Sequence, residues 1–184
     1  NKEIELIENR DYENFKFISV GNFKPQKNYS YLVEVLKVLK FRKFPFKHII
    51  VGDGTEMKKI EREIIANDLS NDLILVGSIA QPLDLIEQAD LFVLPSSFEG
   101  FGLVIVEALS VGTTVVSTDC FSGPSDILKN GELGYLSDID NAENFADTII
   151  HACSNKLNSD MLKLRAKDFT IEKIGPKYIE LLRS

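Results

Sequence analysis

The chain has 184 residues, of which 44% are hydrophobic and 27% are charged, a balance that is ordinary for a globular protein. This length is enough for one well-buried α/β domain and does not require a second core. The formal net charge of -7 argues against a protein that coats nucleic acid or an anionic lipid surface through its average charge.

Short β-branched or aromatic runs alternate with helical patterns along the chain, and no internal repeat is present. The predicted strands are residues 15–20, 48–51, 73–76, 91–94, 114–117 and 134–136. The predicted helices are residues 29–40, a segment after Thr55, and residues 82–88, 103–109, 142–153 and 171–182, with Asn28 and Thr55 as caps of the first two. This order predicts an α/β fold with a doubly wound parallel sheet, Rossmann-like, of about six strands with helices on both faces.

The first 14 residues are highly charged and are interpreted as a linker or domain edge. No signal peptide opens the sequence and no apolar run approaches the roughly 20 residues of a membrane span, so a cytoplasmic location is expected. Cys120 and Cys153 match no metal-ligand or redox spacing and are expected to be structural. His48 and His151 are expected to have packing or surface roles.

Three loops that follow predicted strands are rich in glycine and polar residues: residues 21–28, 52–54 and 95–102. All three are expected at one edge of the sheet, because ligands of such sheets bind beyond the carboxyl ends of the strands. Glycine lets the backbone approach a ligand, and the amides at a helix start attract anions. Taken singly, residues 52–54 fit a tight turn and the lysines fit solubilising charges. Together with Lys24 and Lys27, the three loops predict a site for a diphosphate.

The helix at residues 103–109 is apolar on all sides apart from Glu107, and we expect it to be buried around its whole circumference. An unpaired buried carboxylate is strongly destabilising. Glu107 is therefore expected to accept a hydrogen bond from a ligand hydroxyl, the alternative being backbone amides or a lysine of the chain itself. Glu99, in the loop before this helix, is a second candidate, although loop carboxylates are commonly only solvated.

Residues 95–108, with the sequence PSSFEGFGLVIVEA, resemble the retaining family-4 glycosyltransferases of the GT-B fold, whose motif has two glutamates with seven residues between them. Here these are Glu99 and Glu107. The resemblance covers nearly the whole chain and includes residues 20–28, 51–54, 89–90, 115–119 and 123–127. It implies that residues 1–184 are the carboxy-terminal nucleotide-sugar-binding domain of a two-domain enzyme, without its amino-terminal acceptor domain.

Carried over by position, the resemblance implies that Glu107 binds the nucleotide ribose and that Glu99 binds the hydroxyls of the donor sugar. Lys27 would hold the diphosphate, and Glu99 and Lys27 are the candidate catalytic residues. The implied donor-binding positions are Gly21, Asn22, Lys24, Lys27, Gly52, Gly54, Phe101, Gly102, Leu103 and Glu107.

The resemblance also implies the substrates. The donor would be a UDP- or GDP-linked sugar, used without a cofactor, and a hexosyl group would be transferred with retention. The acceptor would be a glycan or lipid-linked glycan, as in capsule or lipopolysaccharide assembly, bound through the missing domain. The isolated domain would then be inactive, and the full-length protein could contact a membrane peripherally. No metal is expected, on the ground that no Asp-X-Asp cluster stands at a strand end.

Two positions depart from the family pattern. The family usually has arginine directly after the first-loop glycine, where this chain has Asn22. Asparagine brings no charge, so either Lys24 supplies the cation or the diphosphate is held less tightly. The family's glutamate in a later loop is Asp126 here, which shortens the reach of the carboxylate.

Three other functions share parts of the pattern. A dinucleotide-dependent oxidoreductase fits poorly, because Gly-X-Gly-X-X-Gly is missing after the first strand and Met57 stands where the third glycine would follow Gly52 and Gly54. A non-catalytic nucleotide-sugar-binding module and a nucleotide-sugar 2-epimerase of the GT-B fold stay as alternatives. No P-loop, nucleophile elbow or basic aromatic strip for nucleic acid is present.

Overall fold

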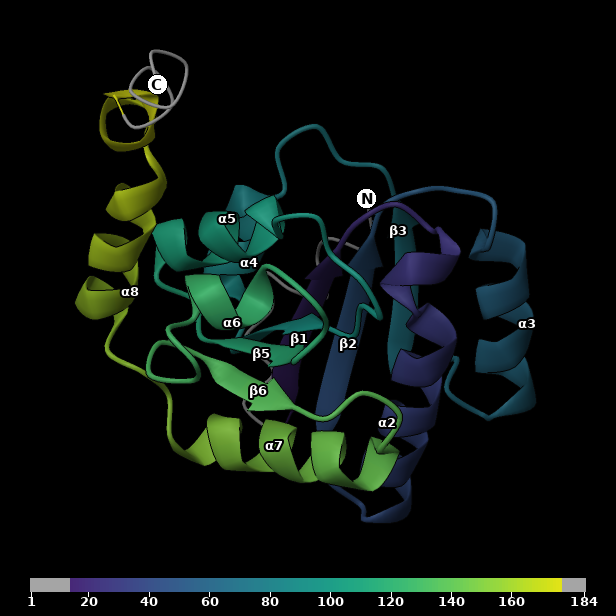
Figure 1. Cartoon of the computed structure of the whole chain (residues 1–184). Coiled ribbons are helices and arrows are strands. Elements are labelled where there is room, and N and C mark those ends of the chain that lie inside the picture. The colour runs from purple at the N-terminus through teal and green to yellow at the C-terminus, as the bar shows by residue number, and fades with distance from the viewer. Residues whose placement is uncertain (1–13, 177–184) are drawn as a thin grey trace.

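Six short β-branched and aromatic runs form one parallel sheet in the computed structural model, which describes residues 14–176 (Figure 1). The strands are β1 (Phe15–Val20), β2 (Phe46–Val51), β3 (Leu73–Gly77), β4 (Leu91–Leu94), β5 (Val115–Thr118) and β6 (Tyr135–Ser137). Their order in the sheet is β3-β2-β1-β4-β5-β6. Winding reverses between β1 and β4, which creates the switch point where such sheets bind ligands. The predicted fold class is confirmed.

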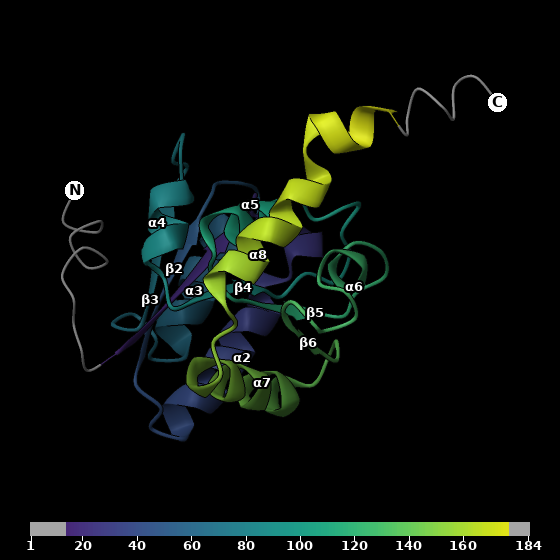
Figure 2. The same ribbon diagram turned by 90° about the vertical axis from the view of Figure 1, so that its left-hand side faces the viewer.

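Helices cover both faces of the sheet, as Figure 2 shows from the side. On one face lie α2 (Tyr29–Phe41), α3 (Met57–Ala66) and α7 (Ala142–Ser154). On the other face lie α4 (Leu83–Gln88), α5 (Leu103–Val111), α6 (Pro124–Ile127) and α8 (Ser159–Ala166). The 3₁₀ turns η1 (Pro25–Lys27) and η2 (Lys167–Phe169) complete the elements. Each face has its own buried apolar cluster, so the sheet is apolar on both sides, as parallel sheets require.

Asp90 fixes the position at which β4 enters the sheet. Its backbone N–H donates to the Lys16 carbonyl at 2.7 Å, and its Oδ2 accepts from the Lys16 backbone N–H at 2.7 Å. Lys156 Nζ donates to the second carboxylate oxygen. These bonds set the register in which Phe17 lies opposite Leu91. This part of the family resemblance therefore has a structural role, at the amino ends of the strands.

The predicted strands all form, each within two residues of its predicted ends. The sequence did not predict α6 or α8. Helix α8 was missed because its apolar residues do not share one face, so that only Leu162 and Ala166 are buried. The predicted helix at 171–182 is helical over residues 171–176, and the remainder lies outside the described residues. The interpretation of residues 1–14 as a linker also falls outside them, apart from Asn14.

The two predicted helix caps are only partly right. Asn28 occupies the N-cap position of α2, but its side chain makes no capping bond. Helix α3 begins after Glu56, and the Thr55 hydroxyl instead donates to the Phe23 carbonyl at 3.5 Å. Asn28 departs from the usual cap because it also ends η1, in a left-handed conformation with φ 52°.

His48 lies in the core, as expected, and Ser19 connects it to β4. The Ser19 hydroxyl donates to the Val93 carbonyl at 2.6 Å, and His48 Nε2 lies 2.9 Å from Ser19 Oγ. Because the serine proton is already used, Nε2 must carry the proton of the neutral ring. Within the described residues, His48 Nδ1 is buried and has no hydrogen-bond partner. Burial lowers the pKa of His48 to about 3.

Candidate functional site

The three glycine-rich loops do meet at the carboxyl edge of the sheet, in the upper part of Figure 1. The Gly21 N–H donates to the Val51 carbonyl at 2.9 Å, and the Phe23 N–H donates to the Asp53 carbonyl at 3.0 Å. The third loop joins the first, because the Ser97 N–H donates to the Gln26 carbonyl at 2.9 Å. The backbone thus holds the loops after β1, β2 and β4 together.

Two glycines after β2 are needed for this loop packing. A Cβ atom on Gly52 would lie 2.1 Å from the Gly21 carbonyl oxygen, and one on Gly54 would lie 2.7 Å from the Phe23 carbonyl oxygen. Both residues also have positive φ angles, 148° and 156°. Their close approach is to the neighbouring loop, so their proposed contact with a donor stays a prediction.

Lys27 and Glu99 form an ion pair at the centre of this edge. Lys27 Nζ donates to Glu99 Oε1 at 2.7 Å, and the same oxygen accepts from Ser96 Oγ at 2.6 Å. Glu99 is only 8% exposed, and the Lys27 side chain is 16% exposed. The two predicted catalytic residues are therefore brought together, from η1 and from the loop before α5. Charge-assisted bonds of this kind are about twice as strong as neutral ones.

Tyr29 lies close enough to Glu99 to feel its charge, and it was not predicted as a site residue from the sequence. Its hydroxyl donates to the Gly21 carbonyl at 3.2 Å, and its side chain is buried against Phe23. Burial raises the pKa of Tyr29, and the negative charge of Glu99 raises it further. The phenol therefore stays protonated and keeps the first loop in place.

Helix α5 begins at this edge with its positive end. Leu103 is its first residue and Gly102 its N-cap, and no acidic side chain lies in the first turn. Gly123 packs beneath Phe101, and the Ser122 hydroxyl donates to the Glu99 carbonyl at 2.7 Å. The loop after β5 therefore supports the loop before α5. A helix start of this kind favours an anion.

The prediction that α5 is buried on all sides is wrong. Only Ile105, Ala108 and Leu109 are buried, whereas Leu103 is 62% exposed and Glu107 is half-buried. Helices α4, α6 and α8 and strand β5 contact α5, but they do not cover Leu103. Composition shows that a face is apolar, but it does not show what covers that face.

Glu107 is nevertheless not neutralised by any residue that the structure describes. Among residues 14–176, no hydrogen bond or ion pair to its carboxylate is present. Partial burial raises the pKa of Glu107. The carboxylate is thus a partly desolvated acceptor on the exposed side of α5.

Three further predicted residues lie apart from the ion pair or on the open surface. Asn22 is exposed. Lys24 lines a small polar hollow together with Glu56 and Lys59, between η1 and α3. Asp126 is exposed on α6, where its carbonyl oxygen accepts from Arg165 Nη2 at 2.8 Å. Within the described part of the chain, no hydrogen bond or ion pair joins these side chains to Lys27 or Glu99.

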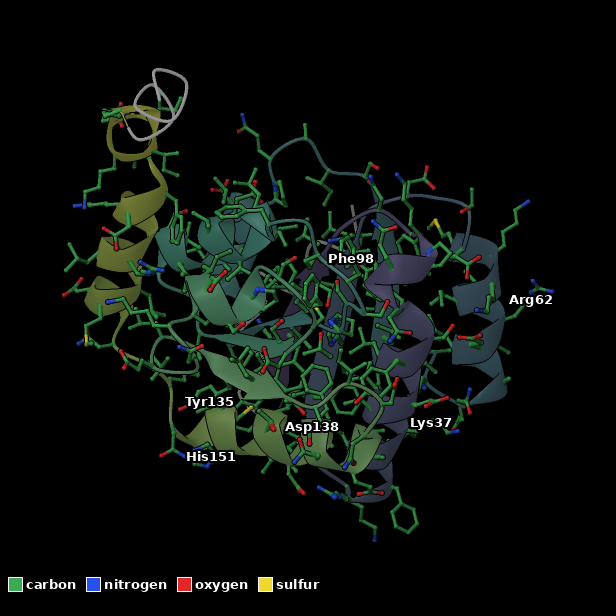
Figure 3. All side chains as sticks on the ribbon, in the orientation of Figure 1. Lys37, Arg62, Phe98, Tyr135, Asp138 and His151 are labelled. Atoms are coloured by element: carbon green, nitrogen blue, oxygen red, sulfur yellow. The ribbon has the colours of Figure 1, made fainter. Side chains whose placement is uncertain are left out.

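An Asp-X-Asp sequence does follow a strand, which corrects one ground for expecting no metal. Residues 138–140 (Asp-Ile-Asp) come directly after β6. Figure 3 labels Asp138 near α7, well separated in that view from Phe98 in the loop before α5. Across residues 14–176, no group of three or more His, Cys, Asp or Glu side chains is placed to hold a metal ion.

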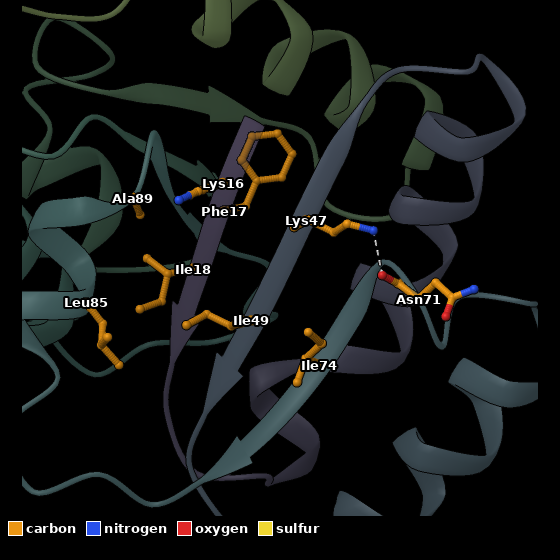
Figure 4. Close-up of a pocket in the computed structure, with 9 residues that line it drawn as sticks. All are labelled: Lys16, Phe17, Ile18, Lys47, Ile49, Asn71, Ile74, Leu85 and Ala89. Carbon is orange, nitrogen blue, oxygen red and sulfur yellow. Dashed lines mark hydrogen bonds between the residues drawn. The ribbon is translucent and has the colours of Figure 1, made fainter. Parts of the chain in front are cut away.

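An apolar pocket lies at the opposite end of the strands (Figure 4). Its volume is about 90 Å³, and it lies against the sheet face formed by Ile18, Ile49 and Ile74. Lys47 Nζ, at its rim, donates to the Asn71 carbonyl at 2.7 Å. The pocket lies at the amino ends of the strands and is therefore separate from the loop edge.

The fold and the loop edge define a class: a Rossmann-like domain with a polar site beyond the carboxyl ends of its strands, at the switch point. The family model described as "Glycosyl transferases group 1" matches residues 1–169. The chain therefore belongs to the group 1 glycosyl transferase family, which has the GT-B fold.

Individual relatives support this membership. A 2-deoxystreptamine N-acetyl-D-glucosaminyltransferase from Niallia circulans is 29% identical over 172 residues, which are 90% of this chain and 44% of the relative. A UDP-Gal:α-D-GlcNAc-diphosphoundecaprenol α-1,3-galactosyltransferase from Escherichia coli is 30% identical, covering 81% of this chain and 39% of the relative. The chain thus spans less than half the length of these relatives.

A solved structure shows the same fold. A variant of TarM from S. aureus, in complex with fondaparinux, α-GlcNAc-glycerol and UDP, superposes with a TM-score of 0.83 at 26% identity. The match covers 94% of this chain and 36% of TarM. Within residues 14–176, no helix has the length and apolar character needed to cross a membrane.

Proposed function

We propose that this chain is the carboxy-terminal, donor-binding half of a retaining family-4 glycosyltransferase. The observation that carries the proposal is the Lys27–Glu99 ion pair at the loop edge, close to the start of α5. A cation, a carboxylate and a helix start in one place match the charges of a nucleotide-diphosphate sugar, in which an anionic diphosphate joins a hydroxyl-rich sugar. The Glu99–Glu107 spacing and the family membership support the same reading.

In this proposal the diphosphate lies between Lys27 and the amides at Phe101, Gly102 and Leu103. Glu99 accepts hydrogen bonds from the donor sugar, and Glu107 accepts them from the ribose. The lack of a partner for the Glu107 carboxylate among residues 14–176 supports this role, because a partly desolvated carboxylate gains most from a ligand donor. The loops that contain Gly21, Asn22, Lys24, Gly52 and Gly54 form the rest of the edge.

The chemistry assigned to the site is charge neutralisation. The bond between the anomeric carbon and the diphosphate oxygen breaks, and its electron pair leaves with the nucleoside diphosphate. Lys27 and the positive end of α5 stabilise that negative charge. The acceptor hydroxyl oxygen forms the new bond to the anomeric carbon with retained configuration, and its proton passes to an oxygen of the departing nucleoside diphosphate.

The acceptor site belongs to a further, amino-terminal domain in this proposal. The chain spans less than half of the relatives named above, which leaves room for such a domain. We propose a glycan or lipid-linked glycan as acceptor and UDP or GDP as the donor nucleotide, in a cytoplasmic protein that contacts the inner membrane face. The E. coli relative, whose name includes a diphosphoundecaprenol acceptor, and the UDP in the TarM structure support these choices.

Calorimetric titration of the chain with UDP, GDP and their sugars tests the donor proposal. We expect one nucleotide to bind better than the other and to bind with or without its sugar. Binding of none of them would refute the proposal. A transfer assay then compares the chain with the same chain joined to an amino-terminal acceptor domain, and turnover is expected only in the two-domain protein.

Two alternatives keep the donor site and differ in outcome. A nucleotide-sugar 2-epimerase would convert labelled donor into its epimer and transfer nothing. A non-catalytic binding module would bind the donor and leave it unchanged in the two-domain protein as well. Analysis of products from labelled donor therefore separates all three.

A further inference from the structure

Two different hydrogen-bond donors hold the same oxygen of the Glu99 carboxylate. Lys27 Nζ reaches Oε1 from η1, and Ser96 Oγ reaches the same oxygen from within the third loop. Lys27 belongs to the edge that a ligand would meet, and its side chain is 16% exposed. Ser96 is 0% exposed. A ligand can therefore compete for the lysine but cannot reach the serine.

Ser96 is itself fixed by the neighbouring strand. Its carbonyl oxygen accepts from Thr118 Oγ1, at the end of β5, and the same hydroxyl lies 3.4 Å from the Leu94 carbonyl oxygen. Thr118 is also fully buried. Because β4 and β5 are hydrogen-bonded neighbours, the serine hydroxyl is attached to the rigid part of the sheet. The adjacent Ser97 is exposed, and its hydroxyl meets only the Gln26 carbonyl, at 3.3 Å.

We propose that Ser96 is a positioning residue that keeps the Glu99 carboxylate in place when Lys27 turns from Glu99 to the diphosphate of the donor. This inference rests on the proposed function. A diphosphate is a more highly charged partner for Lys27 than one carboxylate, so Glu99 loses one of its two donors on binding. The Ser96 bond then remains, and it aims the carboxylate at the sugar hydroxyls.

The consequence is a separation between nucleotide and sugar recognition. A nucleoside diphosphate carries no sugar for Glu99 to meet, so its affinity does not depend on the orientation of Glu99. The affinity for a nucleotide sugar does depend on the orientation of Glu99. Ser96→Ala is therefore expected to weaken binding of the nucleotide sugar about tenfold, which is the usual effect of losing one hydrogen bond to a charged group. It should change the affinity for the diphosphate alone by less than about twofold.

The test is calorimetric titration of the chain and its variants with UDP against UDP-glucose, UDP-galactose and UDP-N-acetylglucosamine, and with GDP against GDP-mannose. Ser97→Ala is the matched control and should leave both affinities unchanged. If Ser96→Ala folds poorly, Ser96→Cys is the substitute, because cysteine has a similar volume but is only a weak hydrogen-bond donor. It should show the same selective loss of affinity for the nucleotide sugar. Normal binding of the nucleoside diphosphate shows that either variant is folded.

The outcomes are distinct. A loss of affinity for the nucleotide sugar alone supports the positioning role of Ser96. Equal losses of both ligands, or no loss of either by a folded variant, overturn it. If the unaltered chain binds no nucleotide of the panel, the proposed function itself fails, and that result appears before any variant is compared.

Discussion

Lys27 Nζ lies 2.7 Å from Glu99 Oε1, although the two residues are 72 positions apart in the sequence. The pair links the loops that follow β1 and β4, the two neighbouring strands at which the winding of the sheet reverses. Without a donor, each charge neutralises the other. In the proposed function, donor binding exchanges this ion pair for one between Lys27 and the diphosphate, and we expect the affinity for a nucleotide sugar to reflect the difference between the two.

Removing the Glu107 carboxylate should weaken the binding of nucleosides and of nucleotides to a similar extent. Glu107→Ala is expected to lower the affinities for uridine and UDP, or guanosine and GDP, by a similar factor of about ten, because both ligands contain the ribose. Titration calorimetry measures both, and Glu132→Ala, in an exposed loop, is the control. A loss confined to the diphosphate would contradict the ribose role.

Nucleotide binding should not require a divalent metal. Titration in the presence of EDTA is expected to give the same affinity as titration in added Mg²⁺ or Mn²⁺. If the chelator abolished binding, the charge-neutralising role of Lys27 would be insufficient. The two aspartates of residues 138–140 would then be the first ligands to replace by asparagine.

Acid should destabilise the fold through His48. Its pKa is about 3 in the folded chain and near 6.5 when unfolded, so the unfolded state binds the additional proton between these values. Stability is therefore full above pH 6.5 and falls as the pH drops, by about 2 kcal/mol between pH 7.5 and 5. Urea unfolding at several pH values measures this loss. In His48→Leu the slope over this range should flatten, and an unchanged slope would contradict the assignment.

A side chain at Gly52 should disrupt the loop edge. Gly52→Ala would place a Cβ 2.1 Å from the Gly21 carbonyl oxygen at a φ of 148°, so a loss of about 2 kcal/mol or more is expected. Gly100→Ala is the control for stability, because a Cβ there meets nothing within 4 Å. Thermal melting compares them. Equal melting temperatures would show that the loops can separate without loss.

The sheet could be predicted because its central strands are buried on both faces. The residues of β4, for example, are all fully buried, and they form the continuous apolar run that is typical of a strand in a parallel sheet. The order of strands and loops also predicts that Lys27 and Glu99 lie at the same edge of the sheet. Their direct contact follows from side-chain geometry, which the sequence does not contain.

Other features gave no usable sequence signal. Ser96 and Ser97 are adjacent and identical in type, and only the direction of the backbone decides which of them meets Glu99. The open side of α5 was missed because Leu103 is apolar although it is exposed. Helix α8 has too few aligned apolar residues to produce a helical pattern.

The most direct measurement is titration of Lys27→Ala with a nucleoside diphosphate and with the corresponding free nucleoside. We expect the variant to bind UDP or GDP about tenfold or more weakly than the unaltered chain, and to bind uridine or guanosine with unchanged affinity. Lys58→Ala, on the exposed surface of α3, should change neither affinity. Equal losses for both ligands, or no loss for the diphosphate, would show that the diphosphate does not lie against Lys27.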